Sequence, residues 1–205
     1  MTEVWLIRHG ESQFNAEHRW AGWEHPSPLT AQGEAEAQAL ADRLASEDDI
    51  EEIYTSPLQR AWQTAQIIGK ALGLTPVVVT ELREVNVGHV GGLTMDEFAA
   101  QFPEAYERWQ HRADVGFTWP GGENRYQFFQ RAARAVEHVA SKHADDKVVI
   151  VCHGGVIRAT LAHYLPNDYS ESAHLGIYRG LPLLQLNPGT IRVEVVVNHC
   201  LLLVR

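Results

Sequence analysis

Short apolar segments alternate with amphipathic segments along most of this chain, and that alternation restricts the fold more than any other feature. The apolar segments are 4–7, 53–55, 77–79 and 148–151, and they have the length and β-branched content of buried strands. The segments 31–46, 57–72 and 129–140 carry apolar residues at helical spacing. The alternation predicts an α/β fold: a three-layer sandwich with a mostly parallel sheet and helices on both faces.

Turn and capping signals refine this prediction. Thr30 is the expected N-cap of the first long helix, and Ser56 followed by Pro57 predicts the start of the second. A further helix is expected from Gly154 through His163. The tail contains the expected strands 183–186, 191–197 and 201–204. The turn Asn187-Pro188-Gly189 between them predicts an antiparallel edge.

Segment 85–122 breaks the alternation. It is rich in glycine, aromatic residues and mixed charge, with one helical piece near 95–111. We interpret 1–205 as a single domain in which 85–122 is a cap inserted over one end of the sheet.

Composition and charge exclude several classes of protein. The formal net charge of −9, from 26 acidic and 17 basic residues, argues against a broad face for nucleic acid. The two cysteines, Cys152 and Cys200, are too few for a disulfide framework or a multi-cysteine zinc site. No apolar run approaches the roughly 18 residues of a membrane span, and the start does not read as a signal peptide. We expect a cytoplasmic protein without a nucleic-acid or membrane partner. The oligomeric state stays open, a dimer included.

Two of the expected strands end in a histidine followed by a glycine. These are Ile7-Arg8-His9-Gly10 and Val151-Cys152-His153-Gly154. In open α/β sheets, ligands bind outside the carboxyl ends of the strands, often beside helix N-termini. A single His-Gly pair would indicate a turn, but two pairs in equivalent places favour a binding site. The glycines let backbone N–H groups approach a ligand closely.

The segment Leu6–Ser12, with Asn15 beyond it, resembles the nucleophile motif of the histidine phosphatase superfamily, which includes the cofactor-dependent phosphoglycerate mutases. Further motifs of that family follow in its order and cover nearly the full chain. They are Pro28-Leu29-Thr30 with Gly33, 55–61 with Thr64, Leu82-Arg83-Glu84, Pro120-Gly121-Gly122-Glu123 and 151–158.

This resemblance implies a catalytic set. A neutral His9 attacks phosphorus in line and carries a phosphohistidine, while Arg8 and Arg60 hold the phosphate oxygens. Glu84 is the implied general acid for the leaving group and then the base for water. His153, protonated, is implied opposite His9. The set needs no metal and no cofactor.

The resemblance also implies that the loop after the nucleophile lines the substrate mouth. The implied substrate-binding residues are Asn15, Trp20, Gly22, Trp23 and Gly154. We expect the opposite wall to come from the insertion, although core packing accounts for its tryptophans about as well. The candidates for that wall are Arg108, Trp109, His111, Arg112 and Trp119.

Several neighbouring residues allow two interpretations. Glu81 lies one helical turn from Glu84 and competes with it for the acid–base role. We favour a packed thiol for Cys152 and a structural ion pair for Arg158. We expect Glu123 to bind backbone N–H groups of the helix that it opens.

The predicted function is hydrolysis of a small phosphorylated metabolite. The mutases of this family usually have a longer insertion with a lysine and paired arginines, and no lysine occurs here between Lys70 and Lys142. The sequence therefore resembles the phosphatase branch more than the mutases, and a cofactor-dependent phosphoglycerate mutase is the enzyme alternative. A non-catalytic protein-binding module on the same fold is the alternative of another class.

Overall fold

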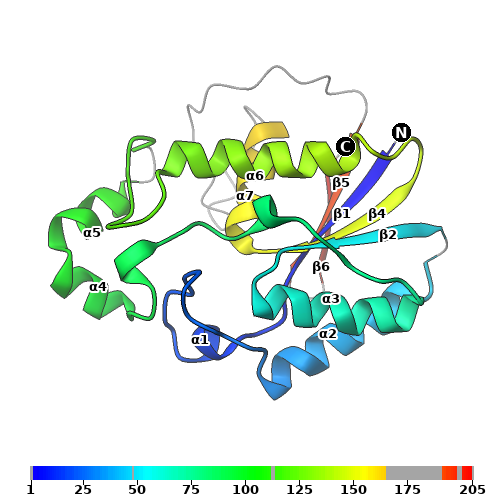
Figure 1. The fold of residues 1–205 in the computed structure, drawn as a ribbon, viewed down its shortest axis with the longest axis horizontal. Coiled ribbons are helices and arrows are strands. Elements are labelled where there is room, and N and C mark those ends of the chain that lie inside the picture. The colour runs from blue at the N-terminus through cyan, green and yellow to red at the C-terminus, as the bar shows by residue number, and fades with distance from the viewer. Residues whose placement is uncertain (1, 48, 112–113, 165–190, 198–199, 205) are drawn as a thin grey trace.

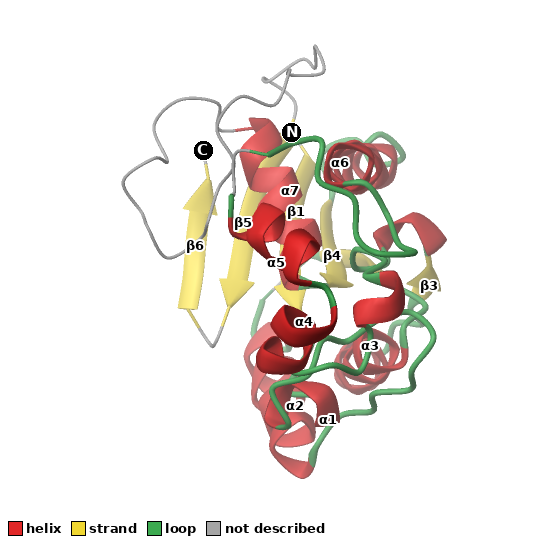
Figure 2. Ribbon diagram, turned by 90° about the vertical axis from the view of Figure 1, so that its left-hand side faces the viewer, coloured by secondary structure: helices red, strands yellow, loops and turns green. Residues whose placement is uncertain are grey.

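A six-stranded sheet in the order β3-β2-β4-β1-β5-β6 forms the centre of the computed structural model, which describes residues 2–47, 49–111, 114–164, 191–197 and 200–204. Neighbouring strands are parallel except for β5 and β6, which pair antiparallel at one edge (Figure 2). The expected mostly parallel sheet with an antiparallel edge is confirmed. The strands are β1 (Thr2–Arg8), β2 (Ile50–Thr55), β3 (Val77–Val78), β4 (Lys147–Cys152), β5 (Ile191–Val197) and β6 (Cys200–Val204).

Helices cover both faces of this sheet (Figure 1). Side chains alternate along β1, so that Val4 and Leu6 pack with α6 (Arg125–Ala140) and α7 (Gly154–Tyr164). Trp5 and Ile7 point the other way and pack with α2 (Ala31–Leu44) and α3 (Gln59–Leu72). This arrangement confirms the three-layer sandwich. Among the described residues, no helix is both long enough and apolar enough to cross a bilayer.

The two helix starts with capping signals differ in outcome. Thr30 caps α2 as expected, because its hydroxyl accepts the Gly33 N–H at 3.0 Å. The expected cap at Ser56 is wrong, since α3 begins at Gln59 with Leu58 as its N-cap. Ser56 lies fully buried directly after β2, where its hydroxyl faces His153 at 2.8 Å. Its hydroxyl also accepts the Leu58 N–H at 3.2 Å, which shapes the turn before the helix.

Segment 85–122 forms its own layer of short helices beside the sheet (Figure 1). The expected single helical piece is two helices, α4 (Met95–Gln101) and α5 (Pro103–Gln110), because Pro103 disfavours a helical residue before it and starts the second helix. Phe98, Phe117 and Trp119 are buried in a separate aromatic cluster of this segment. We keep the interpretation of 85–122 as a cap within one domain as a prediction.

The remaining short elements are α1 (Gln13–Ala16) and the 3-10 turns η1 (Thr80–Leu82) and η2 (Gly88–Val90). The expected strand 183–186 and the turn Asn187-Pro188-Gly189 lie outside the described residues.

Candidate active site

The carboxyl ends of β1, β2 and β4 lie side by side and present His9, Ser56 and His153 at one edge of the sheet. Parallel pairing aligns Arg8 with Cys152, and the His9 N–H donates to the Cys152 carbonyl at 3.1 Å. The rings of His9 and His153 are 5.1 Å apart between centroids and inclined at 62°. Two histidines separated by most of the chain therefore lie edge to face, and of the two only His9 lines the cavity described below.

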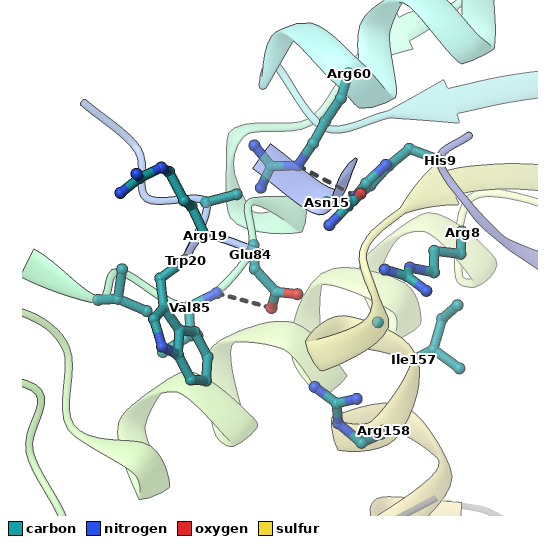
Figure 3. A pocket seen from close by; sticks show the side chains of 13 residues that line it. Arg8, His9, Asn15, Arg19, Trp20, Arg60, Glu84, Val85, Ile157 and Arg158 are labelled. Carbon is teal, nitrogen blue, oxygen red and sulfur yellow. Dashed lines mark hydrogen bonds between the residues drawn. The ribbon is translucent and has the colours of Figure 1, made fainter. Parts of the chain in front are cut away.

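The hydrogen bonds of His9 determine which ring nitrogen carries the proton. The Arg60 Nε–H can only donate, and it points at His9 Nε2 from 3.1 Å (Figure 3). Nε2 therefore holds a lone pair, and Nδ1 donates to the Gly10 carbonyl at 2.7 Å. Burial, and then the charge of Arg60, lowers the pKa of His9 to about 3. The imidazole is neutral near pH 7, with its nucleophilic nitrogen directed at Arg60.

His153 is completely buried, and its Nε2 contacts the Ser56 hydroxyl at 2.8 Å. Burial, and then Arg60, holds the pKa of His153 well below its ordinary value. The protonated His153 implied by the family resemblance is therefore wrong for this structure, in which the ring is neutral. Its Nδ1 has no hydrogen-bond partner among the described residues.

Arg8 and Arg60 place two guanidinium groups at the cavity. Arg60 is only 2% exposed, and burial lowers its pKa to about 10, with Glu84 opposing the shift and Arg8 adding to it. It remains charged near neutral pH. Arg8 is exposed at the end of β1, and its side chain reaches toward Gly154 at the start of α7 (Figure 3).

The Glu84 carboxylate is held against the N-terminus of α7. It accepts the N–H of Val85 and the N–H of Gly155, each at 2.9 Å. A Cβ on Gly155 would overlap the Glu84 Oε1 atom, so this close approach requires glycine. Glu84 lines the cavity, whereas the side chain of Glu81 does not.

Most of the expected site residues line one cavity of about 430 Å³ (Figure 3). Those that line it are Arg8, His9, Asn15, Trp20, Arg60, Glu84 and Gly154. The Oδ1 atom of Asn15 accepts from the Ser12 N–H at 3.2 Å and its hydroxyl at 3.0 Å, which leaves the side-chain NH₂ to donate to a ligand.

Two expected substrate-binding residues do not line the cavity. Gly22 is buried against Gly91 and Val87. The Arg83 guanidinium lies over Trp23, with its carbon 3.7 Å from the centroid of the indole ring. The indole N–H of Trp23 donates to the Glu84 carbonyl at 2.7 Å. Trp23 therefore supports the Glu84 loop and does not form the substrate wall.

Of the basic wall expected from the insertion, none of the described residues lines this cavity. Arg108 pairs with Asp114 at 2.9 Å. Trp109 and Trp119 pack around Trp20, with ring centroids 5.4 and 5.0 Å away, so packing accounts for both tryptophans. His111 does not line the cavity, and Arg112 lies outside the described residues.

Two of the open alternatives have structural answers. Cys152 is fully buried in the core, where burial raises the pKa of its thiol, as expected of a packed cysteine. Glu123 is structural, but its partners differ from the expected helix N–H groups. It pairs with Arg131 at 2.9 Å and accepts the Asn86 N–H at 3.2 Å.

The ion pair expected for Arg158 has no counterpart in the described ranges. Within the part of the chain that the structure describes, no carboxylate lies within 4.0 Å of Arg158, and its side chain lines the cavity (Figure 3). The sequence held a signal for this position. Residues four apart share a helix face, so Arg158 had to lie above Gly154.

No group of three or more histidine, cysteine or acidic side chains suited to a metal ion occurs among the described residues.

Comparison with known proteins matches the model of the histidine phosphatase superfamily (branch 1) to residues 4–198. The chain is 36% identical over 167 residues to Phosphoglycerate mutase-like protein 4 of Arabidopsis thaliana, covering 80% of this chain and 72% of that protein. It is 38% identical over 160 residues to the Metal-independent phosphoserine phosphatase of the same plant, covering 78% and 67%. The solved structure of mycobacterial glucosyl-3-phosphoglycerate phosphatase is similar with a TM-score of 0.68 at 33% identity, covering 78% of this chain and 77% of that one.

Proposed function

This chain belongs to the histidine phosphatase superfamily and is a phosphoric monoester hydrolase, and from that premise we propose that it hydrolyses a small phosphorylated metabolite through a phosphohistidine on His9. One observation carries the proposal. The lone pair of a neutral His9 points at the buried Arg60, beside the ring of His153. A nucleophile and a cation that face one another in this way suit a phosphate bound between them.

In the first step, a phosphate monoester dianion enters and its oxygens take over the Arg60 N–H that points at His9. His9 Nε2 attacks phosphorus in line, forming a P–N bond as the P–O bond to the leaving group breaks. The leaving oxygen takes a proton from Glu84, which must hold that proton beforehand. Arg8 and Arg60 stabilise the charge on the transferring oxygens.

In the second step, water attacks the phosphohistidine and Glu84 accepts one of its protons. The P–N bond breaks, inorganic phosphate leaves, and His9 regains its lone pair. The Gly10 carbonyl, which binds Nδ1 at 2.7 Å, keeps the ring in one orientation through both steps.

The size of the substrate follows from the cavity and from the relatives. A cavity of about 430 Å³ suits a small molecule. Relatives named for phosphoserine and for glucosyl-3-phosphoglycerate support a small phosphate monoester. A relative named phosphoglycerate mutase-like keeps mutase activity as the second candidate.

The test uses p-nitrophenyl phosphate and a panel of phosphorylated metabolites. We expect His9→Ala to lose at least roughly 10³-fold in kcat, because no other group replaces the nucleophile. His138→Ala, at an exposed histidine of α6, is the matched control and should retain the wild-type rate. A His9→Ala rate equal to the control rejects the proposal. Incubation with 3-phosphoglycerate separates the second candidate, since a mutase yields 2-phosphoglycerate without free phosphate.

A further inference from the structure

Arg158 is a cation of the cavity that the proposed reaction does not use. Its side chain is exposed on α7 and points into the cavity (Figure 3). Arg19, on the other side of the cavity, differs. Its guanidinium pairs with Glu97 at 3.0 Å and Glu17 at 3.3 Å. Arg158 has no such acidic neighbour in the described ranges, so no described carboxylate compensates its charge.

Arg158 also lies close to another uncompensated cation. Its Nη1 atom is 3.6 Å from the point where a Cβ on Gly154 would lie, and Arg8 Nε is 3.8 Å from the same point. Two guanidinium groups that approach one point repel each other unless an anion lies between or beside them. The arrangement therefore favours bound negative charge near the start of α7.

One phosphate group does not balance the positive charges of the cavity. When Glu84 holds the proton that the leaving group needs, the cavity contains the uncompensated cations Arg8, Arg60 and Arg158. A phosphate monoester dianion balances two of these three positive charges. The third positive charge is that of Arg158, whose side chain is exposed, whereas Arg60 is buried.

We propose that Arg158 binds a second acidic group, a carboxylate or a second phosphate, on the part of the substrate that leaves. This inference rests on the proposed function and narrows its substrate class. The substrate is a phosphate monoester that carries another negative charge, held by Arg158 while Arg8 and Arg60 hold the transferring phosphate.

The test compares substrates that differ by one acidic group. Phosphoserine and phosphoethanolamine differ by a carboxylate, and fructose 1,6-bisphosphate and fructose 6-phosphate differ by a phosphate. For Arg158→Ala, kcat/KM for the acid-bearing member should fall about tenfold more than for its partner, because a charged hydrogen bond is lost. Arg134→Ala, at an exposed arginine of α6, is the matched control and should leave the ratio unchanged.

Binding without turnover separates this inference from the proposed function. By calorimetry in the His9→Ala background, which lacks the proposed nucleophile, Arg158→Ala should weaken the binding of 3-phosphoglycerate about tenfold more than the binding of inorganic phosphate. Equal weakening of both ligands would overturn the inference and make Arg158 a ligand of the transferring phosphate. No weakening of either would overturn it as well, and would leave the arginine merely solvated. The proposed function fails on a different result, an active His9→Ala variant.

A second inference comes from a different observation, the unpartnered Nδ1 of the buried His153. The ring is neutral, so it carries one proton. Ser56 Oγ already accepts the Leu58 N–H at 3.2 Å. Among the described residues, the only acceptor that the Ser56 hydroxyl proton reaches is His153 Nε2 at 2.8 Å. With Nε2 accepting, the proton of the ring lies on Nδ1.

We infer that Ser56 is a positioning residue that fixes this tautomer of His153, so that Nδ1–H donates to an oxygen of the phosphate on His9. The opposite tautomer would present a lone pair to the phosphate and repel it. The rings of His9 and His153 lie 5.1 Å apart between centroids, and Nδ1 is the ring nitrogen of His153 that has no partner among the described residues. This role depends on the proposed function but requires no contact between Ser56 and substrate.

The test is ¹⁵N NMR of histidine-labelled protein, with the His153 signals assigned from a His153→Gln spectrum. In the wild type, Nδ1 should have a protonated shift and Nε2 an unprotonated shift. Ser56→Ala should mix the two tautomers and lower kcat about tenfold with a smaller change in KM. Ser27→Ala is the matched control, because Ser27 is also buried and accepts a backbone N–H, from Phe14 at 3.1 Å.

Three results would overturn the second inference. The first is a wild-type spectrum with the proton on Nε2. The second is a Ser56→Ala spectrum and kcat that match those of Ser27→Ala. The third is a loss of activity in Ser56→Ala with the tautomer unchanged, since that result indicates a structural role alone.

Discussion

The floor of the cavity and its mouth are built in different ways. The floor, which we define as the lining residues Arg8, His9 and Arg60 with His153 packed behind His9, comes from residues at or just after strand ends and from the first turn of α3. The mouth, which we define as Arg19, Trp20, Val87 and Arg158, comes from a loop, the insertion and the second turn of α7. Pairing of parallel strands determines the floor. Packing of aromatic side chains across distant segments determines the mouth.

This difference separates chemistry from selectivity. The floor is held by the sheet, and burial keeps its two histidines neutral, so its residues suit one reaction. The mouth rests on Trp20, which packs on Phe98 at 6.2 Å and on Trp119 at 5.0 Å between ring centroids. Changes in the insertion can reshape the mouth without moving the strand ends. We therefore expect variants of the floor to change kcat and variants of the mouth to change the ranking of substrates.

The largest effect should come from Glu84, which joins the two regions. Glu84→Gln removes the proton donor, and kcat on an alkyl phosphate should fall about 10²–10⁴-fold. The loss on p-nitrophenyl phosphate should be much smaller in the first step, because its leaving group needs no proton. Single-turnover kinetics measure this step. Glu81→Gln is the control, and an equal loss on both substrates would remove Glu84 as the general acid.

A smaller loss should follow from moving Glu84 without removing it. In Gly155→Ala the new methyl group overlaps the Glu84 carboxylate, and a displacement of about 1 Å costs about 10²-fold in kcat. Steady-state rates and thermal unfolding of Gly155→Ala and the wild type check this. A folded Gly155→Ala variant with an unchanged kcat contradicts the described position of Glu84.

Lowering the pH should destabilise the folded protein, because the buried His9 of the floor is neutral. The pKa of His9 is about 3 in the folded protein and near 6.5 when unfolded, so the unfolded chain binds more protons between these values. Stability therefore falls as pH falls from about 6.5 toward 3. From pH 7 to 5 the free energy of unfolding should drop by about 2 kcal/mol more in the wild type than in His9→Asn. Urea unfolding at the two pH values measures it, and parallel losses would contradict a buried neutral His9.

A substitution in the mouth should give the smallest change in kcat. Trp20→Leu removes the ring that lines the cavity but leaves the strand ends in place. We expect the ratios of kcat/KM among metabolites to change by about tenfold, with a smaller fall in kcat than any floor variant gives. A substrate panel measures this ranking. A fall in kcat as large as that of Glu84→Gln, with the ranking unchanged, would contradict the division between floor and mouth.

Much of the floor could be predicted because its determinants are local in the sequence. A buried strand that ends in histidine and glycine has its carboxyl end where ligands bind, and parallel pairing places two such ends together. The alternation of Val4, Trp5, Leu6 and Ile7 between the two helix layers follows from the period of a strand.

The errors arise where a residue's role depends on distant partners. Ser56 stands in the sequence where a helix cap is expected, but its hydroxyl hydrogen-bonds to His153 on the neighbouring strand end. Trp23 has the position of a wall residue, but Arg83 and the Glu84 carbonyl hold it. The charge of His153 depends on burial and on Arg60, neither of which a motif reveals. Such contacts appear only in the folded protein.

The most direct test is to locate the phosphoryl group during turnover. The protein is mixed rapidly with a phosphorylated substrate, quenched without acid, digested, and the peptides are analysed by mass spectrometry. The account predicts that the peptide containing His9 gains one phosphoryl group in the wild type and none in His9→Ala. A phosphoryl group on any other side chain, or steady phosphate release from protein that never acquires one, would contradict it.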